Sequence, residues 1–77
     1  MSKEDLEEAV LFCSEDIRFK TADYRSYYFR GKALIALGKN KRGVKDLRKA
    51  VRLIEYQLKA VLQEMLAEAK SLIEENE

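Results

Sequence analysis

Arg25, Tyr28, Phe29 and Lys32 are the residues of this sequence whose types best suit the binding of another molecule. They place an aromatic pair between two cations. The rings supply apolar contact area and the cations supply charge-assisted hydrogen bonds, so the group suits an extended peptide that carries a carboxylate or acidic side chains. The alternative is that the rings pack against another helix of the same chain or of a second copy.

A second candidate is an anion-binding patch formed by Lys39, Lys41, Arg42 and Lys45. Although the net charge is +1, residues 1–17 carry one Lys and six acids, residues 18–52 carry twelve Lys or Arg and two Asp, and residues 53–77 carry two Lys and six acids. This separation indicates either an anionic partner or pairing between the basic centre of one chain and the acidic ends of another. Nucleic-acid binding by the basic face of residues 39–52 is therefore the alternative to protein binding.

Catalytic and metal-binding residues are scarce. The sequence has no histidine, which removes the commonest general base and a plausible zinc set. Glu64 and Glu68 lie one helical turn apart, but on a helix this acidic they indicate a solvated face. The single Cys13 cannot form an intramolecular disulfide, and its helical position predicts a buried thiol whose pKa is raised by Glu15 and Asp16. We therefore expect no enzymatic activity, no cofactor and no metal.

The apolar spacing predicts an all-α protein with a single domain over residues 1–77. Proline is absent, and 3–4 spacing of apolar residues indicates helices over about 3–19, 22–37 and 41–75, with Thr21 as the N-cap of the second. No apolar run approaches the ~20 residues of a membrane span, and the first residues lack the basic start of a signal peptide. A cytoplasmic location without membrane contact is expected.

The third helix is longer than so small a body can cover. Its outer half must either join a second chain or fold back near Tyr56 and Gln57. We favour a continuous helix that forms a homodimer through its wide apolar stripe, which consists of Leu58, Val61, Leu62, Met65 and Leu66. The fold-back monomer remains the alternative.

Residues 24–55 resemble one tetratricopeptide repeat (TPR), a helix–turn–helix unit of 34 residues. The matching positions are Tyr27, Gly31, Leu34, Gly38, Leu47 and Ala50. Residues 4–19 align with the second helix of a preceding repeat, and the line SYYFRGKALIALG is similar to the last repeat of co-chaperone and immunophilin-type domains. Arg30 and Gly43 depart from the usual leucine and alanine of the family.

The resemblance implies a protein-interaction adaptor made of antiparallel helical hairpins. It places Gly31 and Ala50 at the closest approach of the second and third helices, and it places Arg25, Tyr28, Phe29 and Lys32 on a concave groove. In such domains a Lys and an Arg four residues apart clamp a terminal carboxylate. Here the two positions are occupied by Arg25, which can donate hydrogen bonds, and Phe29, which cannot.

Overall fold

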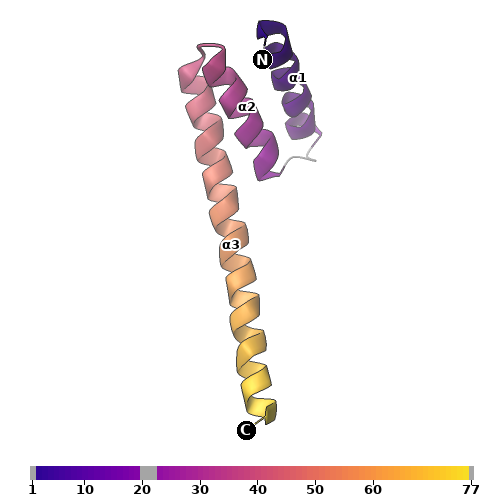
Figure 1. Cartoon of the computed structure of the whole chain (residues 1–77), viewed down its shortest axis with the longest axis vertical. Coiled ribbons are helices and arrows are strands. Elements are labelled where there is room, and N and C mark those ends of the chain that lie inside the picture. Colours follow the sequence, from indigo (N-terminus) through magenta and orange to yellow (C-terminus); the bar gives the residue numbers. More distant parts are fainter. Residues whose placement is uncertain (1, 20–22, 77) are drawn as a thin grey trace.

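Three helices make up the described part of the protein, residues 2–19 and 23–76 of a computed structural model (Figure 1). They are α1 (Lys3–Arg18), α2 (Tyr24–Ala36) and α3 (Asn40–Asn76). The described residues contain no strand, so the all-α prediction is confirmed. The predicted cap Thr21 lies outside the described residues, and the N-cap of α2 is instead Asp23, whose carboxylate accepts a hydrogen bond from the Arg25 amide at 2.8 Å.

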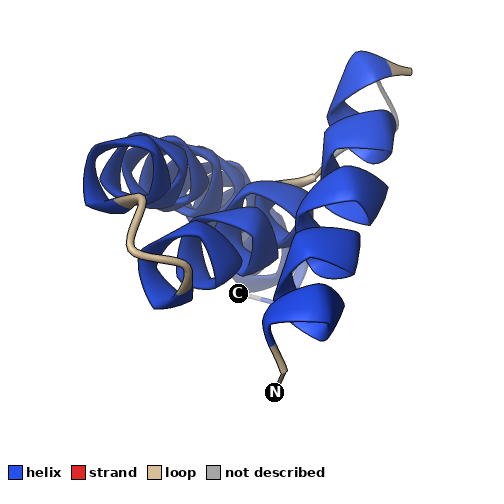
Figure 2. Ribbon diagram, turned by 90° about the horizontal axis from the view of Figure 1, so that it is seen from above, coloured by secondary structure: helices blue, strands red, loops and turns tan. Residues whose placement is uncertain are grey.

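Viewed from above, α2 lies between α1 and α3 (Figure 2), and it is the helix that contacts both of the others. The first helix starts at a serine cap, because the Ser2 hydroxyl accepts a hydrogen bond from the Asp5 amide. Its buried residue is Cys13, and the most buried large side chain of the described chain is Leu34 on α2. The small core therefore lies on the two sides of α2.

A tight turn joins α2 to α3, and the two helices cross at a pair of glycines. Gly38 has a φ of 85°, the left-handed conformation that glycine adopts most readily after a helix. A Cβ atom built on Gly31 would lie 2.9 Å from the Gly43 carbonyl oxygen, and one built on Gly43 would lie 2.7 Å from the Gly31 carbonyl oxygen. The two backbones thus approach more closely than any residue with a side chain would allow.

The sequence placed Gly31 and Ala50 at the closest approach of these helices, and the structure puts Gly43 opposite Gly31. Ala50 is buried, with 1% of its surface exposed, but the atoms nearest to a Cβ on Gly31 belong to Gly43 and Leu47. In an antiparallel pair, a residue further along α3 lies level with a residue earlier on α2. Gly31 therefore lies level with Gly43, and Ala50 lies level with an earlier part of α2.

Arg30 connects all three helices. Its guanidinium donates hydrogen bonds to Asp46 on α3, Nε to Oδ2 at 2.6 Å and Nη2 to Oδ1 at 2.8 Å, while Nη1 donates to the Ser14 hydroxyl on α1 at 3.3 Å. The side chains of Arg30 and Asp46 are only 21% and 8% exposed. Hydrogen bonds to Asp46 raise the pKa of the Arg30 guanidinium further above its usual range, so this partly buried group stays charged.

The third helix continues without a bend to Asn76 and extends far beyond α1 and α2 (Figure 1). The molecule measures 61 Å along its longest axis against 22 and 20 Å along the others. The chain does not fold back near Tyr56, and every described residue from 54 to 76 is exposed. Among the described helices, none is long and apolar enough to cross a membrane.

Candidate protein-interaction surfaces

A groove between α1 and α2 contains one half of the predicted aromatic site. Phe29 of α2 and Phe12 of α1 line it, and both rings are largely exposed, by 53% and 69%. Ala9 and Cys13 supply the rest of its apolar lining from α1. Two exposed rings on neighbouring helices offer an apolar ligand a contact on both sides.

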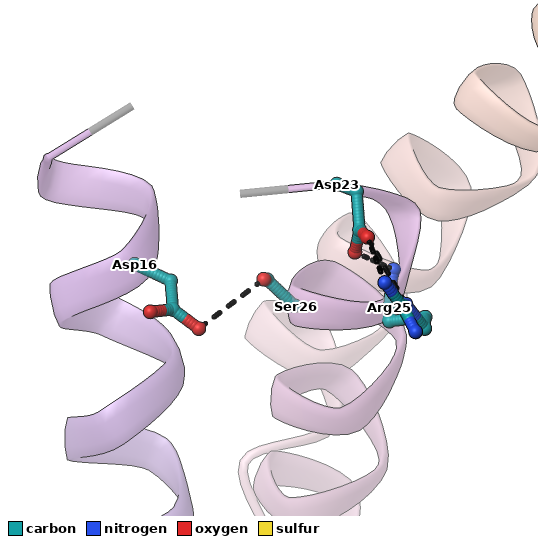
Figure 3. A network of polar contacts seen from close by, with 4 residues as sticks. All are labelled: Asp16, Asp23, Arg25 and Ser26. Carbon is teal, nitrogen blue, oxygen red and sulfur yellow. Dashed lines mark hydrogen bonds and ion pairs between the residues drawn. The ribbon is translucent and has the colours of Figure 1, made fainter. Parts of the chain in front are cut away.

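The rim of this groove is acidic. Arg25 is the cation that lines it, and the acids that line it are Asp5, Glu8, Asp16 and Asp23. Arg25 is moreover engaged, because its Nε and Nη2 donate to Asp23 Oδ2 at 3.0 and 2.7 Å (Figure 3). These hydrogen bonds lower the pKa of the Asp23 carboxyl and keep it ionised at neutral pH. The lining of the groove therefore carries more acidic than basic side chains, in contrast to the two cations, Arg25 and Lys32, from which an acidic ligand was predicted.

Two residues that line the groove, Ser26 and Asp16, form a polar contact between the two helices. The buried Ser26 hydroxyl donates to Asp16 Oδ2 at 3.5 Å, a long hydrogen bond from α2 to α1 (Figure 3). Asp16 is thus held toward α2 and beside the ligand space rather than on the outer surface of α1. This placement could not be predicted from the sequence, because Asp16 is one of six acids in the first 17 residues.

Tyr28 and Lys32, the other half of the predicted site, do not line this groove. The Lys32 ammonium lies 5.1 Å from the centre of the Tyr28 ring, within the range of a cation–π contact. Tyr28 also meets Phe29 edge to face, with ring centres 5.3 Å apart. The four predicted residues therefore form one continuous surface of α2, but only Arg25 and Phe29 reach the groove with α1.

Comparisons with protein-family models, with curated proteins and with solved structures find no match to this chain. Its function is therefore inferred from its own surfaces.

A second groove runs along the first half of α3. Val44, Leu47 and Val51 form its apolar centre, and the cations that line it are Lys41, Lys45, Arg48 and Arg52. Lys41 and Lys45 belong to the predicted basic patch, whereas Lys39 and Arg42 do not line this groove. Arg48 and Arg52 were missed as site residues, although their spacing of three and four from Lys45 and Arg48 places them on the same helical face. We call the seven residues that line this groove, with Asn40, the basic groove.

The predicted dimer stripe lies on the second half of α3, where it has no cover from α1 or α2. Its five members, Leu58, Val61, Leu62, Met65 and Leu66, are 50 to 60% exposed. Leu58, Leu62 and Leu66 also line a shallow groove with Glu55, Lys59 and Gln63. We call the five residues the distal stripe.

No cluster of His, Cys, Asp or Glu among the described residues could hold a metal ion. Cys13 lines the acidic groove but is 8% exposed, as the sequence predicted. Burial, followed by the charge of Asp16, raises the pKa of its thiol. The thiol is therefore protonated at neutral pH, and a protonated thiol is a poor nucleophile.

Cys13 should report the opening of the contact between α1 and α2. We expect it to react with a thiol reagent far more slowly in the native protein than in urea, because both its burial and its raised pKa suppress the thiolate. The measurement is the reaction rate at neutral pH with and without denaturant. A Tyr56→Cys variant provides an exposed thiol on α3 for comparison, and equal native rates for the two thiols would contradict the burial of Cys13.

Proposed function

We propose that this protein is a TPR-like protein-interaction module that acts as an adaptor, and that it has no enzymatic activity. The observation that carries the proposal is the groove between α1 and α2, where two exposed rings lie within a rim of ionised side chains. Apolar area surrounded by charge is typical of a peptide-binding surface. A cytoplasmic location, where a lone cysteine stays reduced, agrees with this function.

The helical arrangement supports the family part of the proposal. Gly31 of α2 meets α3 at close range, and Gly38 adopts a left-handed conformation in the turn that follows α2; both are positions at which the chain resembles the repeat. The co-chaperone type of carboxylate clamp has less support, since Phe29 occupies one clamp position and Arg25 is paired with Asp23. The module therefore suits a partner other than a terminal carboxylate.

The rim defines the chemistry of the partner. Four carboxylates against one arginine give the groove a negative field, which repels an acidic peptide and attracts a basic one. The rings of Phe12 and Phe29 would bind the apolar side chains of the same peptide. We therefore propose a ligand segment with apolar residues and interspersed Lys or Arg.

Two labelled peptides of equal length test this proposal. Both carry the same leucine positions, and one has lysines where the other has glutamates. Fluorescence anisotropy should show that the lysine peptide binds about tenfold more tightly or better, a difference of about 1.4 kcal/mol. The difference should shrink as salt is raised, because exposed charges are screened.

Variants identify the groove as the site of binding. Phe29→Ala and Glu8→Lys should each weaken binding of the lysine peptide, whereas Glu15→Lys, an exposed acid of α1 outside the groove lining, should have little effect. Equal binding of the two peptides, or loss of binding in Glu15→Lys alone, would contradict the assignment.

Nucleic-acid binding remains the second candidate because of the basic groove. Lys41, Lys45, Arg48 and Arg52 share one exposed face of α3, and such a face could contact phosphates. A mobility shift with a generic RNA and a generic DNA at low salt tests it. Binding that disappears in Arg48→Glu and falls steeply with salt would favour this function over the adaptor.

A further inference from the structure

One apolar seam runs along both halves of α3. Val44, Val51, Leu58, Met65 and Leu72 recur every seven residues, and Leu47, Ile54 and Val61 fall between them at steps of three and four. This spacing keeps the side chains on one face of a helix and is typical of a helix that packs along another helix. The seam begins in the basic groove and continues through the distal stripe.

The second half of α3 lacks the support that a helix needs in water. Every described residue from 54 to 76 is exposed, and the seam residues Leu58, Met65 and Leu72 are each more than half exposed. Most helical stability in proteins comes from packing of an apolar face, and this half of α3 packs its apolar face against neither α1 nor α2. The distal stripe is therefore an exposed apolar surface that a second polypeptide could cover.

The charges on α3 indicate which polypeptide that is. Residues 40–52 carry six Lys or Arg and Asp46, whereas residues 53–76 carry five Glu and two Lys. The first half is thus strongly basic beside an exposed apolar centre, and the second half is acidic beside an exposed apolar stripe. Each half presents the surface that complements the other.

The two halves of one straight helix cannot meet, so the complement must come from a second chain. We propose that two copies of this protein associate through α3 in antiparallel orientation, with the distal stripe of each copy packed in the basic groove of the other. A parallel pair would place basic beside basic and acidic beside acidic along its whole length, which costs free energy. The antiparallel pair covers the distal stripe and the basic groove of each copy. Its two contacts are identical, as they must be in a two-fold dimer.

This arrangement differs from a contact between two distal stripes, because it needs the basic groove. It is also independent of the peptide groove between α1 and α2, which remains open on the other side of α2. A failure of either proposal therefore leaves the other intact.

Sedimentation equilibrium of three proteins tests the dimer. The wild-type chain should sediment at twice its 9.0 kDa mass at micromolar concentrations. Leu62→Glu, which places a charge in the distal stripe, and Val51→Glu, which places one in the basic groove, should each sediment as a monomer. A wild-type monomer would overturn the proposal, and so would a Val51→Glu variant that still dimerises.

Mixing the two variants provides the decisive measurement. In an equimolar mixture the intact stripe of Val51→Glu can pack in the intact groove of Leu62→Glu, whereas the second contact of that pair carries both glutamates. Because a contact already broken by one glutamate loses little more from a second, the mixture should form a heterodimer that is weaker than the wild-type dimer but tighter than the self-association of either variant. Its formation also shows that the variants keep a foldable chain. A mixture that associates no more tightly than the separate variants do overturns the stripe-in-groove contact.

Matched controls use glutamates on the opposite face of the same helix. Tyr56 and Ala67 each lie five residues beyond a tested position, about 140° around the helix axis, and both are exposed. Tyr56→Glu and Ala67→Glu should therefore remain dimers. A monomer in both controls would show that added acid on any face breaks the association, and it would overturn the assignment to these two surfaces.

Discussion

Asp46→Ala should lower the free energy of unfolding by about 3 kcal/mol, because it removes one partner of a largely buried ion pair and leaves the Arg30 guanidinium without it. The Arg30 guanidinium also donates a hydrogen bond to the Ser14 hydroxyl of α1. If the guanidinium moves when Asp46 is removed, this contact between α1 and α2 should weaken as well. A domain of this size has a total stability of only about 4–12 kcal/mol, so the loss is a large fraction. Urea denaturation followed by far-UV circular dichroism measures it.

A double variant separates the cost of an unpaired charge from the net contribution of the pair. Arg30→Met with Asp46→Leu replaces both charges by apolar groups of similar size and should recover most of the lost stability, since buried ion pairs and well-packed apolar pairs are often of similar free energy. If Asp46→Ala unfolds at the same urea concentration as the wild type, the bridge contributes nothing and Arg30 is solvated.

Gly43→Ala should also destabilise the protein, by about 1–3 kcal/mol, through overpacking. The new Cβ would lie 2.6 Å from Ile35 Cγ1 and 2.7 Å from the Gly31 carbonyl oxygen, so α2 and α3 would have to separate. The sign is informative, because Gly to Ala inside an exposed helix stabilises it by about 1 kcal/mol. Thermal or urea denaturation that shows a more stable variant would contradict the close crossing.

Larger substitutions at the crossing should have larger effects, and a nearby exposed position provides the control. Gly31→Leu would meet the Gly43 carbonyl oxygen and Leu47 Cγ, both 2.9 Å from its Cβ, and should unfold much of the domain. Ala36→Leu adds the same side chain near the exposed end of α2 and should change stability little. Equal effects at both positions would show that added bulk rather than the crossing is responsible.

The sequence predicted the helices well because helix periodicity is a local property. The steps of three and four from Val44 to Met65 continue without a proline or a turn glycine, and the structure has one continuous helix there. Asp23 caps α2 in the structure, whereas the sequence favoured Thr21, which lies outside the described residues; both residue types are good caps, so local sequence could not choose between them.

The site was harder to predict because it depends on which helices meet. Arg30 was read as a departure from a family pattern, and only the packing of three helices shows that it lies between Ser14 and Asp46. The acidic rim was likewise hidden, since Glu8 and Asp23 are far apart in sequence and come together when α1 crosses α2. The residue types were enough to identify the aromatic pair, but the acidic side chains around Phe29 could be identified only from the tertiary structure.

The middle position of α2 has a consequence for the order in which the chain folds. Among the described residues, α1 packs against α2 and α2 against α3, each helix against its neighbour in sequence. Such a low contact order favours rapid folding, because only short loops must close before the first contacts form. The hairpin of α2 and α3 can nucleate alone around Leu34 and the glycine crossing. Helix α1 packs against α2 alone among the described helices, so we expect it to dock after this hairpin, with the Ser14 hydroxyl accepting the remaining hydrogen bond of Arg30.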